Sequence, residues 1–230
     1  MKIRVAFISL TVVCVTLAAV PALAQVVYDN GPMNGNTDAW TVSSGFIVSD
    51  TLHCCREADG SYAPGGGTID GFNFYAWLFP GDTLSTAELS ITSGENSGTS
   101  FFDQTVSFTQ GSCASNGFGF SVCLESSTFS GPSLAAGTYW VNLQNASVPS
   151  GDPVYWDENS GVGCGGMGCP SQASENTVGS IPSESFTVFG VVNTTSTTTS
   201  TTTSVPEPSS IMLFGSGGLG LAALLRRKFF

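Results

Sequence analysis

Two segments of the chain are rich in side-chain oxygen atoms, the ligands that calcium prefers. Residues 28–38 and 151–159 combine carboxylates and amides with glycine and proline. Calcium takes about six to eight oxygen ligands, so these residue types point to a structural calcium ion. Its candidate ligands are Asp29, Asp38, Asp152 and Asp157. Neither segment has the glutamate that closes an EF-hand loop, and Asx-turns produce the same clusters without a metal.

The second segment also holds two aromatic residues followed by polar side chains. An exposed aromatic ring can stack on the apolar face of a sugar, while neighbouring amides and carboxylates bind its hydroxyl groups. We expect Trp156 to be exposed because polar residues follow it. The core is expected to hold Trp77 and one of Trp40 or Trp140. The candidate glycan-binding residues are Tyr155, Trp156, Asp157 and Asn159.

Residues suited to catalysis are few. His53 is the only histidine, so a Ser-His-Asp triad would have to use it, and no Gly-x-Ser-x-Gly motif occurs. A glycosidase would need two facing carboxyl groups, for which acids such as Asp152, Asp157 and Glu158 are available. No feature of the sequence marks them as buried or as having a shifted pKa. We therefore expect a non-enzymatic protein, with a secreted glycan hydrolase as the alternative.

Six cysteines belong to the expected mature chain. They fall into three pairs along the sequence: Cys54 and Cys55, Cys113 and Cys123, and Cys164 and Cys169. An even number in an exported chain predicts disulfides. The second pair can staple a hairpin and the third can close a glycine-rich loop, which leaves the first pair adjacent. A bridge between adjacent cysteines is uncommon and strained, so cross-pairing of the first and third pairs stays open. The single His53 argues against zinc.

The elements that must position these residues are β-strands. Short β-branched and aromatic runs alternate with Gly, Asn, Asp, Ser and Pro, and helical periodicity is nearly absent from residue 25 to 192. The predicted strands span residues 39–48, 67–78, 86–93, 104–109, 118–124, 137–144, 153–157 and 185–192. Eight short strands with turn signals predict an all-β fold, a β-sandwich of jelly-roll type.

Two of these strands show which side chains should face the core. Residues 67–78 carry apolar side chains on both faces, so we expect this strand to be central in its sheet. In the strand at 137–144, Tyr139, Val141 and Leu143 lie on one face. The more polar opposite face is formed by Trp140, Asn142 and Gln144.

The charge of the predicted domain limits its partners. From residue 25 to 192, Arg56 is the only basic residue against sixteen acidic ones, a net charge of −15. A negative field of this size repels nucleic acid and anionic lipid. We therefore expect no nucleic-acid partner, and solubility outside the cell explains the charge.

The N-terminal 24 residues predict export through the Sec machinery. A basic start precedes an apolar run at 5–20, and Ala22 and Ala24 form an A-x-A cleavage site. Cleavage there leaves Gln25 as the first residue of the mature chain. At the other end of the domain, residues 193–204 are Asn, Thr and Ser only. Such a tract cannot offset its ordering entropy, so it predicts a linker or stalk whose hydroxyl groups are candidate O-glycosylation sites.

Residues 205–230 form a tripartite tail. Its parts are Val205, Pro206, Glu207 and Pro208, then an apolar segment at 211–225, then Arg226, Arg227 and Lys228. The prolines keep the start of the tail extended. The apolar segment predicts a transmembrane helix shorter than the ~20 residues that span a bilayer comfortably. The basic cluster should stay cytoplasmic, which places the domain outside. A permanent C-terminal anchor is the alternative.

This tail resembles the PEP-CTERM sorting signal of Gram-negative bacteria. In that family the signal is read by an exosortase, a membrane cysteine protease thought to remove the helix and pass the protein outward. The segments Tyr28-Asp29-Asn30-Gly31 and 155–160 are similar to those of a recurrent PEP-CTERM sandwich type without an assigned activity. The resemblance implies a precursor in the inner membrane, then a protein of the cell surface or biofilm matrix. We expect such a protein to hold exopolysaccharide.

Overall fold

The computed structural model describes residues 25–56, 60–160 and 171–193, and every helix or strand assigned within these ranges is a β-strand. These residues all belong to one compact unit. The predicted all-β class is therefore confirmed. The helices predicted for the signal peptide and for 211–225 lie outside the described residues. Within the described ranges, no helix is long and apolar enough to cross a membrane.

The first of two antiparallel sheets is built around β4 (Gly67–Leu78), whose bounds equal those predicted from the sequence. Along one edge β4 pairs with β14 and β11, and along the other with β8 and β9. The prediction that this strand is central is confirmed. The other strands of the sheet are β1 (Gln25–Asp29), β2 (Ala39–Thr41), β7 (Thr109–Ser115), β8 (Ser121–Thr128), β9 (Ser133–Leu134), β11 (Tyr155–Asp157) and β14 (Phe186–Val192).

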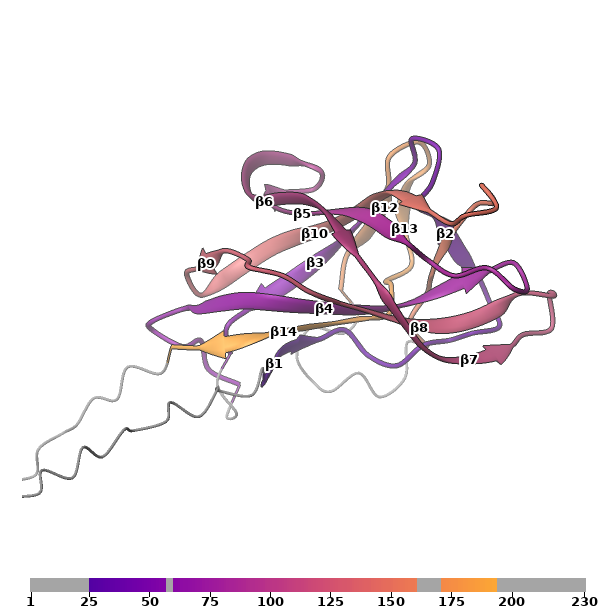
Figure 1. Cartoon of the computed structure of the whole chain (residues 1–230). Coiled ribbons are helices and arrows are strands. Elements are labelled where there is room, and N and C mark those ends of the chain that lie inside the picture. Colours follow the sequence, from indigo (N-terminus) through magenta and orange to yellow (C-terminus); the bar gives the residue numbers. More distant parts are fainter. Residues whose placement is uncertain (1–24, 57–59, 161–170, 194–230) are drawn as a thin grey trace, which may run out of the picture. The chain divides into compact units, whose positions relative to one another are not determined.

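The second sheet has the strand order β13-β12-β3-β10-β5-β6. Its strands are β3 (Ile47–Cys54), β5 (Thr86–Gly94), β6 (Ser97–Ser107), β10 (Gly137–Ser147), β12 (Ala173–Glu175) and β13 (Gly179–Ile181). Figure 1 shows β3, β5 and β10 in one layer, with β1, β4 and β14 in the other. The two sheets thus form a sandwich. The jelly-roll type of strand connection stays a prediction.

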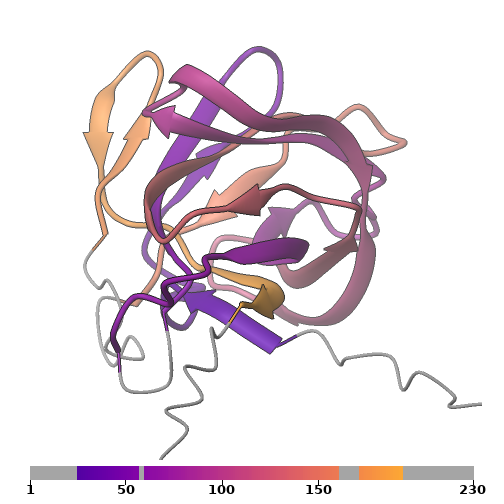
Figure 2. The same cartoon turned by 90° about the vertical axis from the view of Figure 1, so that its left-hand side faces the viewer.

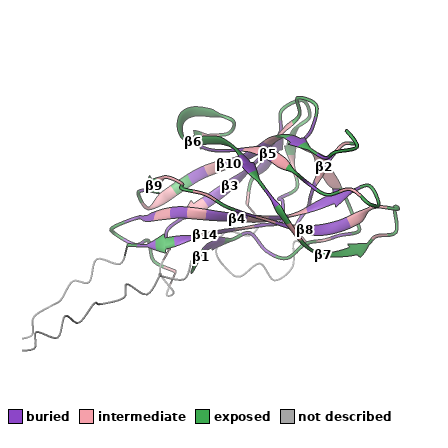
Figure 3. Ribbon diagram, in the orientation of Figure 1, coloured by how far each residue is buried: buried purple, intermediate pink, exposed green. Residues whose placement is uncertain are grey.

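The core lies between the two sheets, where the inward side chains of both layers meet. It includes Phe72 and Phe74 from β4, Leu52 from β3, and Val141 and Leu143 from β10. Inward and outward residues alternate along these strands as the pleat requires. Figure 3 shows the result: β3 and β4 are largely buried, while β6 and β7 are largely exposed. The predicted inner face of the 137–144 strand is confirmed.

The strand predicted at residues 39–48 is wrong as a single element. The chain turns between β2 and β3, where Phe46 N donates to Ser43 O at 3.1 Å. Ser44 and Gly45 have φ angles of 57° and 90°, a left-handed conformation that interrupts an extended strand. The two halves therefore enter different sheets, β2 in the sheet of β4 and β3 in the sheet of β10.

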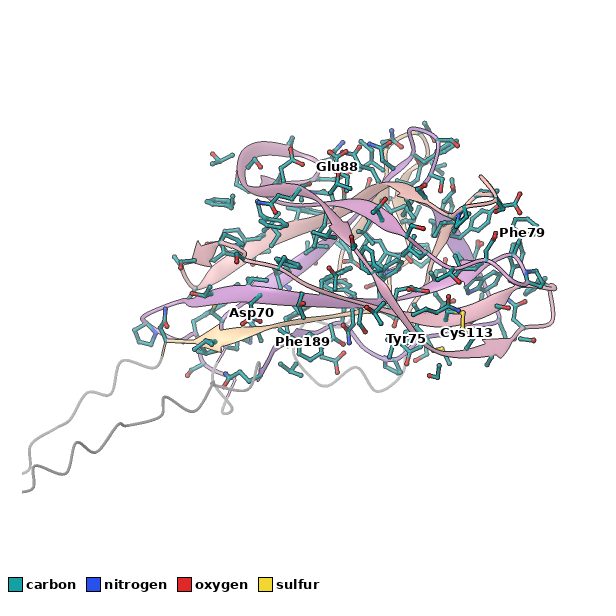
Figure 4. All side chains as sticks on the ribbon, in the orientation of Figure 1. Asp70, Tyr75, Phe79, Glu88, Cys113 and Phe189 are labelled. Carbon is teal, nitrogen blue, oxygen red and sulfur yellow. A yellow bond between two sulfur atoms is a disulfide. The ribbon has the colours of Figure 1, made fainter. Side chains whose placement is uncertain are left out.

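Two disulfides occur among the described residues. Cys113 and Cys123 join β7 to β8, as the hairpin prediction required, and Figure 4 shows this bridge at Cys113. Cys54 and Cys55 form the second bridge, so the structure selects the adjacent pairing over cross-pairing. The third predicted pair lies outside the described residues.

The two ends of the described domain lie side by side. Gln25 of β1 is paired with Gly190 of β14, and Figure 2 shows these strands next to each other. The register between β14 and β4 shifts at Phe189 and Gly190. A Cβ atom at Gly190 would collide with the carbonyl oxygen of Thr68, so this close approach requires glycine. β14, the last strand, is therefore paired along both edges, with β1 and with β4.

Candidate functional site

Trp156 lies in the core, so the prediction that its ring is exposed is wrong. It is 0% exposed and makes edge-on contacts with Phe72, Phe74 and Phe186. Its Nε1 donates to Ser185 O at 2.9 Å. The reason is that β11 pairs on both edges, with β2 and β4, and alternation turns its middle residue inward. Trp156 is therefore a structural residue.

Asp157 and Asn159 also serve the fold instead of a glycan surface. The Asp157 carboxylate accepts from Trp77 Nε1 at 2.5 Å and from Gly35 N at 3.0 Å. Burial raises the pKa of Asp157 to about 6, against the lowering effect of these hydrogen bonds. Asn159 is buried, and its Nδ2 donates to Asn30 O at 3.0 Å. Both side chains tie the segment before β2 to the sheet and lack the exposure that a sugar would need.

Aromatic residues do gather on the outward face of the β4 sheet, beside Tyr155. Trp77 is covered by Phe118, with ring centroids 5.7 Å apart and near-parallel planes. Phe120 packs against Trp77, Phe79 and Tyr155 at 5.6, 5.0 and 5.6 Å. Phe118 is 61% exposed and Phe79 is 37% exposed. We call these five residues the outer strip. Tyr155 is thus the one predicted glycan-binding residue that lies on an aromatic surface.

A polar groove of about 460 Å³ lies on the same face. Asp29, Thr187 and Asn73 are consecutive partners across β1, β14 and β4, so their side chains share one face. Tyr75 follows Asn73 by two residues along β4 and also lines the groove. Figure 4 shows Tyr75 on the side of this sheet that faces away from β5. Trp77, two residues further along β4, points to the same face and belongs to the outer strip, so the groove and the strip are neighbours.

A second group of polar residues lies on the inward face of the same sheet, at its end. Glu158 and Glu184 are directly opposite each other in an isolated antiparallel bridge. Glu158 N donates to Asp38 O at 3.3 Å, one position beyond the pair of Asp157 and Ala39. We call Asp38, Glu158 and Glu184 the acid row. Exposure falls along it, from the exposed Asp38 to 6% at Glu158 and 0% at Glu184.

The buried carboxylates around the acid row differ in how many hydrogen bonds they accept. Asp50, which reaches in from β3, accepts hydrogen bonds from Asn30, Ser171, Ser183 and the backbone of Glu184. Burial raises its pKa to about 6, while these bonds lower it. Among the described residues, Glu184 has no hydrogen-bond partner on either carboxylate oxygen. Burial, followed by repulsion from Asp50 and Glu158, raises the pKa of Glu184 well above its ordinary value.

The structure does not bring the predicted calcium ligands together. Asp29 lines the groove, Asp38 begins the acid row, and Asp157 is bonded to Trp77. Asp152 lies in an exposed turn after Val148. In the parts of the chain that the structure describes, no three histidine, cysteine, aspartate or glutamate side chains are grouped as a metal site.

The residues considered for catalysis are also dispersed. Asp157 and Glu158 are consecutive extended residues, so their carboxyl groups point to opposite faces of the sheet. Glu158 Oε1 accepts from Trp40 Nε1 at 3.1 Å. His53 Nδ1 lies 3.0 Å from Thr138 Oγ1 on the neighbouring strand. Burial and the Arg56 charge lower the pKa of His53.

Sequence reasoning missed Glu184, Asp50, Phe118 and Phe120. Glu184 lies 26 residues after Glu158 along the chain, and only the strand register makes them neighbours. The run Gly117-Phe118-Gly119-Phe120 was a usable signal, because aromatic residues between glycines at a hairpin tip have little chance of burial.

One known sequence motif matches the chain. The PEP-CTERM protein-sorting motif matches residues 204–228, which confirms the resemblance of the tail. The motif implies export of a membrane-anchored precursor that is cleaved for display at the cell surface. No curated protein and no solved structure matches the chain.

Proposed function

We propose that this exported, exosortase-sorted protein is a non-enzymatic component of the cell surface or extracellular matrix that binds a neutral polysaccharide. The observation that carries the proposal is the outer strip, where Phe118 is 61% exposed on top of a buried tryptophan. An aromatic ring held in this way presents a flat apolar face to a sugar ring. Stacking on Trp77 holds the Phe118 ring in place before any ligand arrives.

The neighbouring groove supplies the polar half of such a site. Asp29, Asn73 and Thr187 offer a carboxylate, an amide and a hydroxyl group on one face, and Tyr75 adds a ring beside them. Sugar recognition combines stacking with hydrogen bonds to hydroxyl groups. A chain of sugars can lie along β4, with one unit over the groove and another against Phe118.

The charge of the domain favours a neutral polymer. With a net charge of −15 between residues 25 and 192, an anionic polysaccharide would be repelled unless cations bridged the two. Binding of a neutral glycan through stacking should change little with ionic strength, because it releases no counterions.

We expect Phe118→Ala to weaken binding of the neutral polysaccharide of the producing bacterium roughly tenfold, since one stacked ring contributes about 1 to 3 kcal/mol. The measurement is a calorimetric titration of the purified protein at low and high salt. Phe46→Ala is the matched control, because Phe46 is a surface phenylalanine in the turn between β2 and β3. Equal affinity of the wild type and the Phe118 variant would remove the outer strip as the site. Shortening of the polysaccharide during the titration would favour the hydrolase instead.

The sorting signal predicts a specific processed form. In the producing bacterium, the extracellular protein should lack residues 211–230, because the short apolar segment follows the Pro206-Glu207-Pro208 motif of an exosortase substrate. Mass spectrometry of the C-terminal peptides checks this result. A strain without exosortase should retain the tail and release little protein. Intact tails outside wild-type cells, or equal release from both strains, would contradict exosortase processing.

A further inference from the structure

Glu158 and Glu184 are a facing pair of buried carboxylates. Asn159 N donates to Ser183 O at 2.8 Å, and Ser185 N donates to Asp157 O at 2.9 Å. This pattern makes Glu158 and Glu184 a non-hydrogen-bonded pair, the arrangement in which opposite side chains come closest on one face of the sheet. Like charges placed opposite in this way destabilise a sheet.

Glu184 lacks the donors that its neighbours have. Asp157 receives three N–H donors, from Trp77, Asn34 and Gly35, and Asp50 is also fully engaged. Both Glu184 oxygens are buried and accept no hydrogen bond from the part of the chain that the structure describes. An uncompensated buried carboxylate costs several kcal/mol, so this position needs either a proton or a cation.

The described residues supply no basic side chain to Glu184. Arg56 is the only basic residue between 25 and 192. Its guanidinium group lies 4.7 Å from the centre of the Tyr62 ring and donates to Gly60 O at 3.1 Å. Asp38 meanwhile stands at the exposed end of the acid row and adds a third negative charge. The acid row therefore places three acidic side chains next to one another, with burial increasing from Asp38 at the surface to Glu184.

We propose that Glu158 and Glu184 bind a calcium ion, which enters past Asp38. The glutamates offer oxygen ligands only, which suits a hard cation. Glu158 Oε1 already accepts from Trp40, so its second oxygen remains for the metal. Two carboxylates and water molecules make a weak site, in the range of about 10⁻⁴ to 10⁻³ M that is typical of extracellular modules.

The site is independent of polysaccharide binding, since the acid row and the outer strip lie on opposite faces of the sheet. Calcium would crosslink the segment before β14 to the end of β11. The two facing carboxylates would then share one cation, in addition to the backbone hydrogen bonds that already join these segments. Binding to the folded state alone raises its stability.

The test is calcium titration of the protein purified from its producer, after dialysis against a chelator, with sodium chloride matching the ionic strength. We expect the unfolding midpoint to rise by several degrees by 10 mM calcium, with a dissociation constant between about 0.1 and 1 mM. Glu184→Gln should abolish the rise. Without calcium, this variant should unfold at a higher temperature than the wild type, because a buried glutamate must either carry an uncompensated charge or take up a proton on folding, whereas glutamine does neither.

Glu125→Gln is the matched control. Glu125 lies on β8 and is also fully buried, with no side-chain hydrogen bond to any described residue. It should keep the full calcium response. Asp38→Asn changes an exposed side chain and should weaken calcium binding severalfold without loss of folding. A wild type that ignores 10 mM calcium would overturn the proposal, as would a Glu184→Gln variant that responds like the wild type. An equal response to magnesium, which gives up its water reluctantly, would overturn the assignment to calcium.

Discussion

Glu125→Gln will make the domain more stable than the wild type at pH 8, and the difference will shrink as the pH falls toward 4.5. Glu125 lies inside β8, opposite Phe74. Both of its carboxylate oxygens are buried and have no hydrogen-bond partner among residues 25–56, 60–160 and 171–193. Burial alone raises its pKa to about 8. In the unfolded chain the pKa of a glutamate is close to its ordinary value of 4.5.

The direction of the change in stability with pH follows from proton binding by Glu125 in the two states. Between pH 4.5 and 8 the folded state keeps the Glu125 proton while the unfolded state releases it, so rising pH favours unfolding. The stability that neutral Glu125 contributes is complete below pH 4.5 and is lost as the pH passes 8. Each pH unit in this window costs the wild type up to about 1.4 kcal/mol relative to the variant. Glutamine keeps the size of the side chain but does not titrate.

Urea unfolding of both proteins at pH 5 and pH 8 measures this effect. The comparison isolates Glu125, because the other buried acids titrate in the wild type and in the variant alike. Parallel pH profiles for the two proteins would show that Glu125 is charged in the folded state at neutral pH or has found a partner.

The second large effect is expected at Trp156, which fills the centre of the core. Trp156→Ala should lower the free energy of unfolding by about 3 to 5 kcal/mol, because it leaves a cavity among Phe72, Phe74 and Phe186. It also removes the donor to Ser185 O, whose carbonyl then stays buried without that hydrogen bond. Trp156→Phe retains most of the volume and should lose clearly less.

Chemical denaturation with an unchanged m-value gives these differences. The control is Phe118→Ala on the outer strip, where an exposed ring should cost under about 1 kcal/mol. A Trp156→Ala protein as stable as the wild type would place this tryptophan outside the packed core. Any loss of polysaccharide binding by this variant must therefore be corrected for its unfolded fraction.

The strands that could be predicted are those with a strong local pattern. In β10 the alternation of side chains correctly predicted which face points to the core. In β4 the pattern predicted both the central position of the strand and its two ends. The prediction at 39–48 failed because the turn at Ser44 and Gly45 lies inside a run that otherwise looks extended. β1, β12 and β13 were missed because short strands depend on their partners more than on their own residues.

The candidate sites could be predicted only in part, for the same reason. Trp156 and Tyr155 are adjacent in sequence, yet the pleat sends one into the core and leaves the other beside Phe120. Glu158 and Glu184 carry no shared motif, and their contact is created by the register of two distant segments. The sorting signal is the opposite case, because its residues are contiguous and are read as a linear motif.

The position of β14 has a mechanical consequence. The Thr/Ser tract and the tail follow directly after this strand. Tension on the tethered precursor therefore reaches the domain at Asn193, whose backbone N donates to Gly66 O, and then β14. β14 is hydrogen-bonded to β1 on one edge and to β4 on the other. A pull along its axis must shear both ladders at once, whereas an edge strand could be peeled off bond by bond. The domain is thus attached to its tether through the strand best placed to carry a load.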